Sequence, residues 1–288
     1  MKGSTSLRKV SATAHRAGAP WRSALSVVAA LVVVLACSVG ARATVPVPSD
    51  FQLLTQGRGV KVYRKTYPSG APDYVTVVDL RYATIQSYTG WARPDGTVER
   101  RSLATHWSNA VAQSNSSRQA MVALNGTFFA TDATPYTGIA FGLKANWWNM
   151  STGYAVGKEF PGLIRTFTYD SSFGSSSIQA YDRNIFNAGI PDIVGGLDPT
   201  ADKDKNNFIG RTFVGVRDDN GDGHSETVVF FSSATASQAW AVNVLSGFGT
   251  GSKMMLDGGG STGLIVGGTQ YIKPIRTLPQ VFIVSAGK

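Results

Sequence analysis

Short stretches rich in β-branched and aromatic residues recur along most of this 288-residue chain, separated by Gly, Pro or Asn. This pattern is typical of β-strands, which we expect at 60–65, 74–81, 84–88, 119–124, 137–143, 163–169, 177–181, 192–197, 211–216, 227–231, 254–256, 264–266, 270–273 and 281–285. Two helices are expected, from Ser102 to about Asn115 and from a Thr235/Gln238 capping box to just before Gly247. Strands and helices do not alternate as βαβ units do. The sequence therefore predicts a single α+β domain on a large, curved, mostly antiparallel or mixed sheet.

The first 43 residues have the features of a secretory signal peptide. Basic residues come first, an apolar run follows at 24–36, and Ala41-Arg42-Ala43 provides a small-x-small cleavage site. The run is short for a membrane span, so no stable membrane span is expected from it. A less favoured alternative is a lipoprotein box, Val34-Leu35-Ala36-Cys37, with the lipid on Cys37; the bulky Leu35 argues against it.

Cleavage near Ala43 would leave a linker or docked arm at 44–57 and a folded domain at 58–288 that is secreted, periplasmic or on the cell surface. The removed segment holds six of the 27 basic residues and none of the 18 acidic ones, so 21 against 18 remain and the net charge falls to about +3. No Lys/Arg cluster with interleaved aromatics follows, so nucleic acid is not an expected partner. Cys37 is the only cysteine, so the exported part has neither a disulfide nor a thiol nucleophile.

The segment 253–266 has the clearest candidate site. An apolar run enters Asp257, three glycines and two hydroxyl residues follow, and a second apolar run begins at Leu264, which predicts strand, tight turn, strand. Three glycines can adopt positive φ and leave backbone N–H groups bare for an anion or a sugar. A carboxylate at the end of a buried strand needs a reason to be there.

Four stretches share one format, a buried strand that ends in a small residue and a polar group: Asn125-Gly126-Thr127-Phe128-Phe129, Ile193-Val194-Gly195-Gly196, Arg211-Thr212 before Phe213, and Leu256-Asp257-Gly258-Gly259-Gly260-Ser261. In this order and spacing they resemble the phosphodiester glycosidase family, and Arg276-Thr277-Leu278-Pro279 is similar to its closing element. The resemblance runs from about Gln119 to the C-terminus. Three positions depart from the family pattern and would alter the pocket wall: Thr127 replaces a second Gly, Phe213 replaces a small residue, and Leu197 replaces a Pro.

The resemblance implies a hydrolase that cleaves the glycosidic bond of sugar-1-phosphodiesters, such as a GlcNAc-1-phosphodiester or a teichoic-acid-like cell-surface glycopolymer. It implies catalytic roles for Asp257, Arg211 and Asn125. Substrate contacts are expected from Gly126, Thr127, Phe128, Gly195, Gly196, Thr212, Gly258, Gly259, Gly260, Ser261 and Arg276. The chemistry suits these residue types, because the reaction develops positive charge on the sugar and negative charge on the departing phosphate. Asp257 would stabilise the first charge and Arg211 the second.

Several alternatives stay open. Arg211 would instead pair with Asp257, Asn125 would be a turn residue, and Ser261 would cap a turn. A second catalytic carboxylate would be Asp132 or Glu159. Residues 146–158, rich in aromatics and Gly, are either a binding loop or a surface loop with tucked tryptophans. The rival function is non-catalytic binding of carbohydrate or exopolysaccharide on the same scaffold.

Residues 218–223 match the first half of a Ca²⁺ loop, with Asp218, Asn220 and Asp222 as the ligands. The twelfth position, where a bidentate Glu is needed, is Val229. We therefore interpret the segment as a hairpin turn and expect no cofactor, with Ca²⁺ the less favoured alternative. The separated His106 and His224 indicate neither a zinc site nor a Ser-His-Asp triad.

Overall fold

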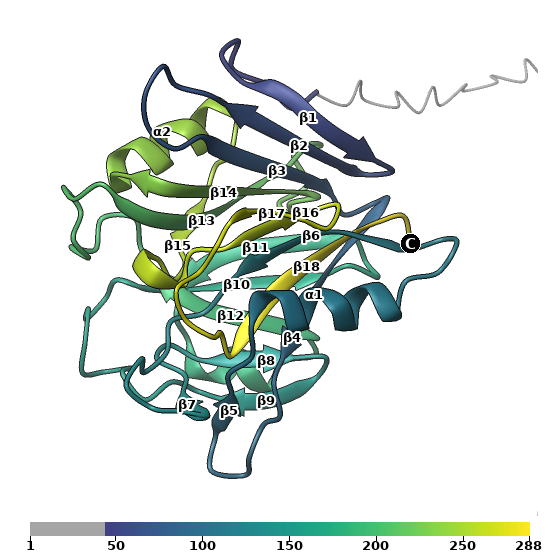
Figure 1. Cartoon of the computed structure of the whole chain (residues 1–288). Helices are drawn as coiled ribbons and strands as arrows, with labels where there is room; N and C mark the ends of the chain where they lie inside the picture. Colours follow the sequence, from purple (N-terminus) through teal and green to yellow (C-terminus); the bar gives the residue numbers. More distant parts are fainter. Residues whose placement is uncertain (1–43) are drawn as a thin grey trace, which may run out of the picture. The chain divides into compact units, whose positions relative to one another are not determined.

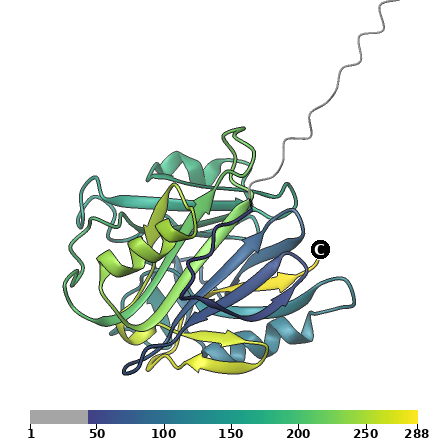
Figure 2. The ribbon, with the colours of Figure 1, turned by 90° about the horizontal axis from the view of Figure 1, so that it is seen from above.

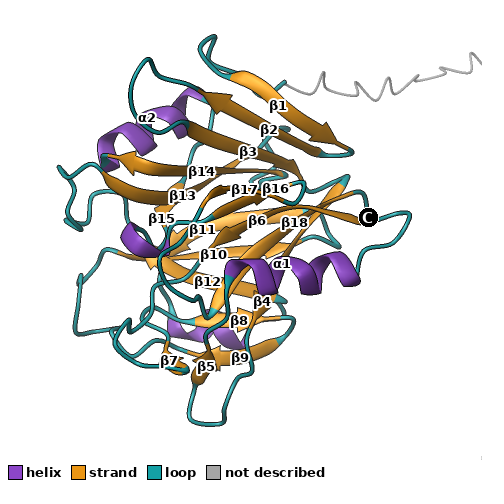
Figure 3. Cartoon of the chain, in the orientation of Figure 1, coloured by secondary structure: helices purple, strands orange, loops and turns teal. Residues whose placement is uncertain are grey.

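The computed structural model describes residues 44–288, so the expected signal peptide, its cleavage site and Cys37 lie outside the described residues. The strands are β1 (Gln52–Gly57), β2 (Val60–Lys65), β3 (Asp73–Asp79), β4 (Ala83–Thr89), β5 (Thr97–Glu99), β6 (Gln119–Asn125), β7 (Tyr136–Gly138), β8 (Leu143–Ala145), β9 (Trp148–Ser151), β10 (Ile164–Asp170), β11 (Ser175–Ala180), β12 (Asp192–Leu197), β13 (Ile209–Arg217), β14 (Thr227–Ala236), β15 (Lys253–Met255), β16 (Leu264–Val266), β17 (Thr269–Ile272) and β18 (Gln280–Ala286). The helices are α1 (Leu103–Ala112), α2 (Gln238–Gly247) and the 3₁₀ turns η1 (Arg183–Asn187) and η2 (Gly259–Ser261). Figure 3 shows how strongly strands predominate.

The strands form two main antiparallel sheets (Figure 1). The larger has 11 strands, with the order β1-β2-β3-β14-β13-β15-β12-β10-β11 and the β8–β9 hairpin added at β12. The smaller has five strands, with the order β17-β16-β6-β18-β4, and β5 pairs with β7 separately. The predicted α+β class and antiparallel pairing are confirmed, with the strands divided between two sheets.

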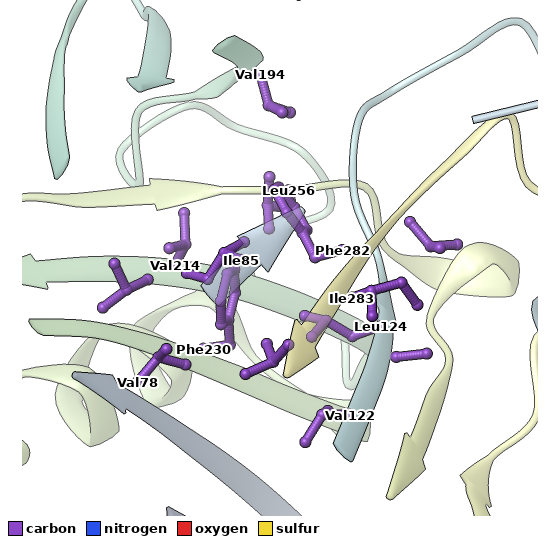
Figure 4. Packing of buried hydrophobic residues seen from close by; sticks show 14 of the residues in the cluster. Val78, Ile85, Val122, Leu124, Val194, Val214, Phe230, Leu256, Phe282 and Ile283 are labelled. Atoms are coloured by element: carbon purple, nitrogen blue, oxygen red, sulfur yellow. The ribbon is translucent and has the colours of Figure 1, made fainter. Parts of the chain in front are cut away.

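The main hydrophobic core lies between the two sheets (Figure 4). Phe230 of β14 packs on Phe282 of β18 with ring centroids 5.1 Å apart, and Phe167 of β10 joins them at 5.9 Å from Phe282. Burial of each such side chain contributes about 2 to 3 kcal/mol relative to exposure. This core packs the two sheets against each other and so fixes the positions of their strand ends relative to one another.

The outer face of the large sheet carries helix α2 (Figure 2). Successive strand residues point to opposite faces, so Phe231 packs with Val244 and Leu245 of α2 while its neighbour Phe230 enters the main core. Because β14 is covered on both faces, its segment Val228–Phe231 is continuously apolar rather than alternating. None of the helices in residues 44–288 is long and apolar enough to cross a membrane.

Some local predictions were wrong. No strand was predicted at residues 52–57, within the expected linker or docked arm, and these residues form strand β1 on β2. Residues 137–143 are not one strand, because β7 ends at Gly138 and β8 starts at Leu143. Helix α2 is capped by Ser237, whose hydroxyl accepts the Trp240 N–H, since Thr235 still belongs to β14.

Candidate active site

The glycine-rich segment crosses from one sheet to the other. Strand β15 before it pairs with β13 in the large sheet, and β16 after it pairs with β6 in the small one. The expected tight turn between two strands is therefore a junction between sheets, and it places Asp257 there. Of the three consecutive glycines, all of which were expected to be able to adopt positive φ, only Gly259 does so, with a φ of 56°. Gly258 and Gly260 are needed for close packing, because a Cβ would lie 2.7 Å from Gly210 O at the first and 2.6 Å from Arg276 Nη2 at the second.

The Asp257 carboxylate is half satisfied. Its Oδ1 accepts the Gly258 N–H at 2.9 Å, whereas Oδ2 is buried and has no hydrogen-bond partner within residues 44–288. Burial raises the pKa of Asp257 to about 6, against the lowering effects of Ser261, Gly258 and the charges of Arg276 and Lys203. The hydroxyl of Ser261 lies near enough to the carboxylate to lower the pKa of Asp257, but it is buried and forms no hydrogen bond of regular geometry within the described chain. An unpartnered buried carboxylate oxygen is costly and is typical of functional sites.

Asn125 positions the Asp257 backbone. At the end of β6, its Nδ2 donates to Asp257 O at 2.6 Å, and its Oδ1 accepts from Thr212 Oγ1 at 2.6 Å and from Gly263 N at 3.1 Å. The side chain is 1 % exposed. Asn125 and Thr212 thus join the first, third and fourth stretches of the sequence into one network. Their polar atoms are engaged by the protein, so these two residues act by positioning.

Arg211 organises a neighbouring loop. Its guanidinium donates to four backbone carbonyls, those of Lys203, Asp204, Asn207 and Ala236. The salt bridge considered between Arg211 and Asp257 is not formed. Burial lowers the pKa of Arg211, which has no ion-pair partner among residues 44–288. Arg211 fixes the loop that carries Lys203.

Arg211 and Asp257 line the same cavity of about 320 Å³. Arg276 also lines it, and its guanidinium has no hydrogen-bond or ion-pair partner within the described part of the chain. Lys203 contributes a second accessible cation, with its Nζ 5.8 Å from the ring centroid of Phe160. Phe128 and Phe129 supply apolar wall. The cavity therefore combines one buried carboxylate with cations whose charge is free to meet an anion.

Among the predicted contact residues, Phe128, Gly258, Gly259, Gly260 and Arg276 line this cavity, together with Asp257 and Arg211. The others lie behind it: Asn125, Gly126, Thr127, Gly195, Gly196, Thr212 and Ser261.

The glycines behind the cavity have packing roles. A Cβ at Gly126 would lie 1.7 Å from Gln280 Oε1, which accepts the Thr127 N–H. A Cβ at Gly195 would lie 2.0 Å from Phe141 O, and one at Gly196 would lie 2.5 Å from Met255 O. Gly195 and Gly196 allow backbone to approach backbone, and Gly126 leaves room for the side chain of Gln280.

Sequence reasoning missed Lys203, Asp204 and Phe129 as lining residues. Asp204 has a φ of 52° and stands in a polar loop without a recognisable pattern, so the only signal was the loop's position before Arg211. The predicted second carboxylates, Asp132 and Glu159, do not line the cavity. Their charges and that of Asp257 add to burial in raising the pKa of Tyr154, so all three carboxylates lie in the neighbourhood of Tyr154.

The Asp218 segment is the turn between β13 and β14, as interpreted. Carboxylate oxygens of Asp218, Asp222 and Glu226 lie within 4.8 Å of one another. Within residues 44–288, this is the group of three acidic side chains that could hold a metal ion. The Asp218 oxygens already accept backbone N–H groups from Asn220, Gly221 and Gly223. This turn is at the end of β13 away from Arg211, about 20 Å along the strand.

The fold and cavity define a class: an antiparallel two-sheet α+β protein with a carboxylate and cations at the sheet junction. No protein-family model matches the chain, and no curated protein matches it. Among solved structures, it is similar to the catalytic domain of zebrafish N-acetylglucosamine-1-phosphodiester α-N-acetylglucosaminidase, autoinhibited by its propeptide. The TM-score is 0.54 at 12% identity, over 81% of this chain and 87% of that one. The shared feature is thus the fold.

Two further structures are weaker matches. A hypothetical protein from Synechocystis has a TM-score of 0.49 at 13% identity, over 79% of this chain and 62% of its own. A protein described as exported, from Burkholderia pseudomallei K96243, has a TM-score of 0.45 at 9% identity, over 78% and 74% of the two chains.

Proposed function

We propose that this chain is an exported hydrolase that cleaves the glycosidic bond of sugar-1-phosphodiesters, with GlcNAc-1-phosphodiesters and teichoic-acid-like polymers as the substrate classes. The observation that carries the proposal is the cavity in which the half-satisfied Asp257 carboxylate lies with Arg276 and Lys203. A glycosyl phosphodiester needs both kinds of charge, because its sugar becomes cationic while its phosphate leaves as an anion.

In the proposed reaction, the bond between the anomeric carbon and the phosphate oxygen breaks, and that oxygen keeps the electron pair. A water oxygen forms the new bond to the anomeric carbon and loses a proton to solvent or a carboxylate. Asp257, in its ionised form, stabilises the developing sugar cation. Arg276 and Lys203 hold the departing phosphate. Asp204, also at the cavity, is the candidate to accept the proton from water.

The arrangement of cations supports a division of roles. Arg276 has no internal hydrogen bond among residues 44–288 to give up, whereas Arg211 already donates to four carbonyls. Arg276 is therefore the proposed phosphate ligand, and Arg211 is the proposed anchor of the loop with Lys203. Phe128 and Phe129 form the apolar side toward a sugar ring.

The test is release of free sugar and phosphomonoester from GlcNAc-1-phosphodiesters and teichoic-acid fragments. Asp257→Asn should reduce kcat at least 100-fold, because a fixed charge at the reacting centre contributes about 3 kcal/mol or more. Arg276→Gln should raise KM and lower kcat. The matched control is Lys273→Gln, an exposed cation three residues earlier that does not line the cavity.

Full activity of Asp257→Asn would refute the catalytic assignment. Retention of glycan without turnover in the parent protein would favour the carbohydrate-binding alternative. Export is tested separately by N-terminal sequencing of the secreted protein, which should begin near Thr44. Retention of Met1, or a lipid on Cys37, would contradict the cleavage prediction.

A further inference from the structure

A second polar cavity of about 320 Å³ lies at the other end of β12. Leu197, the last residue of β12, pairs with Met255 at the Asp257 cavity, whereas Asp192, the first residue, lines the second cavity. Five strand steps separate them, about 16 Å. The start of β4, the β8–β9 turn and the turn after β10 complete its walls. The two cavities share no lining residue.

Trp147 is held in an unfavourable backbone conformation at the mouth of this cavity. Ala145 pairs with Trp148 in the β8–β9 hairpin, so Asn146 and Trp147 form a two-residue turn, with φ of 47° and 72°. Such turns favour Asn-Gly, because both residues need positive φ. A bulky aromatic residue in the Gly position is a genuine outlier, and outliers of this kind cluster at ligand sites.

The surroundings fix the turn and leave most of the Trp147 ring uncovered, with Lys144 Nζ 5.9 Å from the ring centroid. The Trp147 N–H donates to Pro191 O at 2.9 Å, and the Asn146 N–H donates to Asp192 Oδ1 at 3.1 Å. Trp147 nevertheless stays 60% exposed. The constraint therefore presents a large aromatic surface to solvent beside a polar cavity.

The cavity wall offers a carboxyl group and a hydroxyl group for hydrogen bonding. Asp192 is only 6% exposed, and burial raises its pKa to about 7. Thr84 contributes a buried Oγ1 that has no hydrogen-bond partner within the described residues. The lining carries charged side chains of both signs, the cations Arg118 and Lys288 and the carboxyl groups of Asp170 and Asp192.

We propose that this cavity binds an uncharged sugar unit of a glycan chain, with the pyranose ring against Trp147 and its hydroxyls hydrogen-bonded to Asp192 and Thr84. A pyranose has an apolar C–H face and a rim of hydroxyls, which suits an aromatic wall with a few fixed polar groups. A phosphate is disfavoured, since it would approach Asp170 and Asp192. The site is independent of the proposed hydrolysis and would hold a glycan whether or not Asp257 turns it over.

The test is affinity electrophoresis of protein expressed from the full chain, in native gels that contain dextran, hydroxyethyl cellulose or glycol chitin. At least one of these neutral polysaccharides should retard the parent protein. Trp147→Gly should weaken retardation at least 10-fold and leave the melting temperature unchanged or higher, because Gly adopts positive φ without strain. Asp192→Asn keeps an acceptor for the Asn146 N–H and should weaken binding several-fold.

Two variants serve as controls. Trp148→Ala removes the adjacent tryptophan, which is 76% exposed and does not line the cavity, and Asp257→Asn removes the carboxylate of the other cavity. Both should bind like the parent. The proposal is overturned if no polysaccharide retards the parent, if Trp147→Gly and Asp192→Asn bind normally, or if Trp148→Ala loses as much binding as Trp147→Gly. Loss of binding in Asp257→Asn would assign the glycan to the other cavity.

Discussion

Replacement of Asp257 by Asn should change how stability depends on pH. The folded pKa is about 6 and the ordinary value is 3.8. Because the folded pKa is raised, the native state binds more protons than the unfolded state between these values, so Asp257 lowers stability as pH rises through this window. The difference corresponds to about 3 kcal/mol at pH 8. A local cost of this size at a half-satisfied carboxylate is expected where charge is retained for function.

The assay is urea unfolding of the parent and Asp257→Asn at several pH values from 3.5 to 8. Other groups titrate equally in both proteins, so the difference in unfolding free energy isolates Asp257. It should move in favour of the variant by up to about 3 kcal/mol as pH rises, with most of the change between pH 4 and 6.

A control of opposite sign is available at Asp95. Hydrogen bonds from the N–H and hydroxyl of Thr97 hold the pKa of Asp95 below its usual range. The contribution of Asp95 to stability is therefore present above the pKa of the unfolded state and is lost as pH falls. Asp95→Asn should therefore lose stability relative to the parent as pH rises. A pH-independent difference for Asp257→Asn, within about 0.5 kcal/mol, would refute the argument that its carboxylate is buried and costly.

Three other results are expected. Asn125→Ala should lower the unfolding free energy by about 3 to 5 kcal/mol in urea denaturation, because it leaves buried partners at Asp257 and Thr212 unpaired; a loss below about 1 kcal/mol would contradict the network. Gly260→Ala should reduce kcat/KM more than Gly259→Ala, since the new Cβ at position 260 would meet Arg276 Nη2. A Cβ at position 259 would face open space, and alanine there costs only about 1 kcal/mol for its positive φ. Equal activities of the two variants would exclude Arg276 as the phosphate ligand. If ionised Asp257 is required, parental kcat/KM should rise about tenfold per pH unit below 6 and level off above it, and a flat profile from pH 4 to 8 would argue against that role.

Local patterns predicted the elements well where burial of apolar side chains or a helix cap decided the structure. The apolar stretches around Val214 and Phe230 could only be buried strands, and Ser102 caps α1 as expected through the Thr105 N–H. Boundaries failed where a tertiary contact decided them. Strand β1 is only partly buried, so its own composition gives little sign of a strand. Its pairing with β2 makes it one.

The candidate site divides in the same way. The sequence by itself singled out Asp257, because a carboxylate at the end of an apolar strand needs a partner or a function, and the family resemblance predicted Arg211 and Asn125. Only the tertiary structure showed that Asn125 and Arg211 have their donors occupied by backbone carbonyls, while Arg276 has none occupied by the described residues.

Tertiary structure also decided where the glycine-rich segment goes and what surrounds it. The residues alone predict strand, turn, strand, but they do not say whether both strands join the same sheet, since a hairpin and a crossing between sheets have the same local pattern. Pairing of β15 with β13 and of β16 with β6 settles this, and the loop that Arg211 holds by its backbone carbonyls brings Lys203 and Asp204 to the cavity. Local sequence determines which groups are costly to bury, whereas long-range strand pairing determines which of them meet.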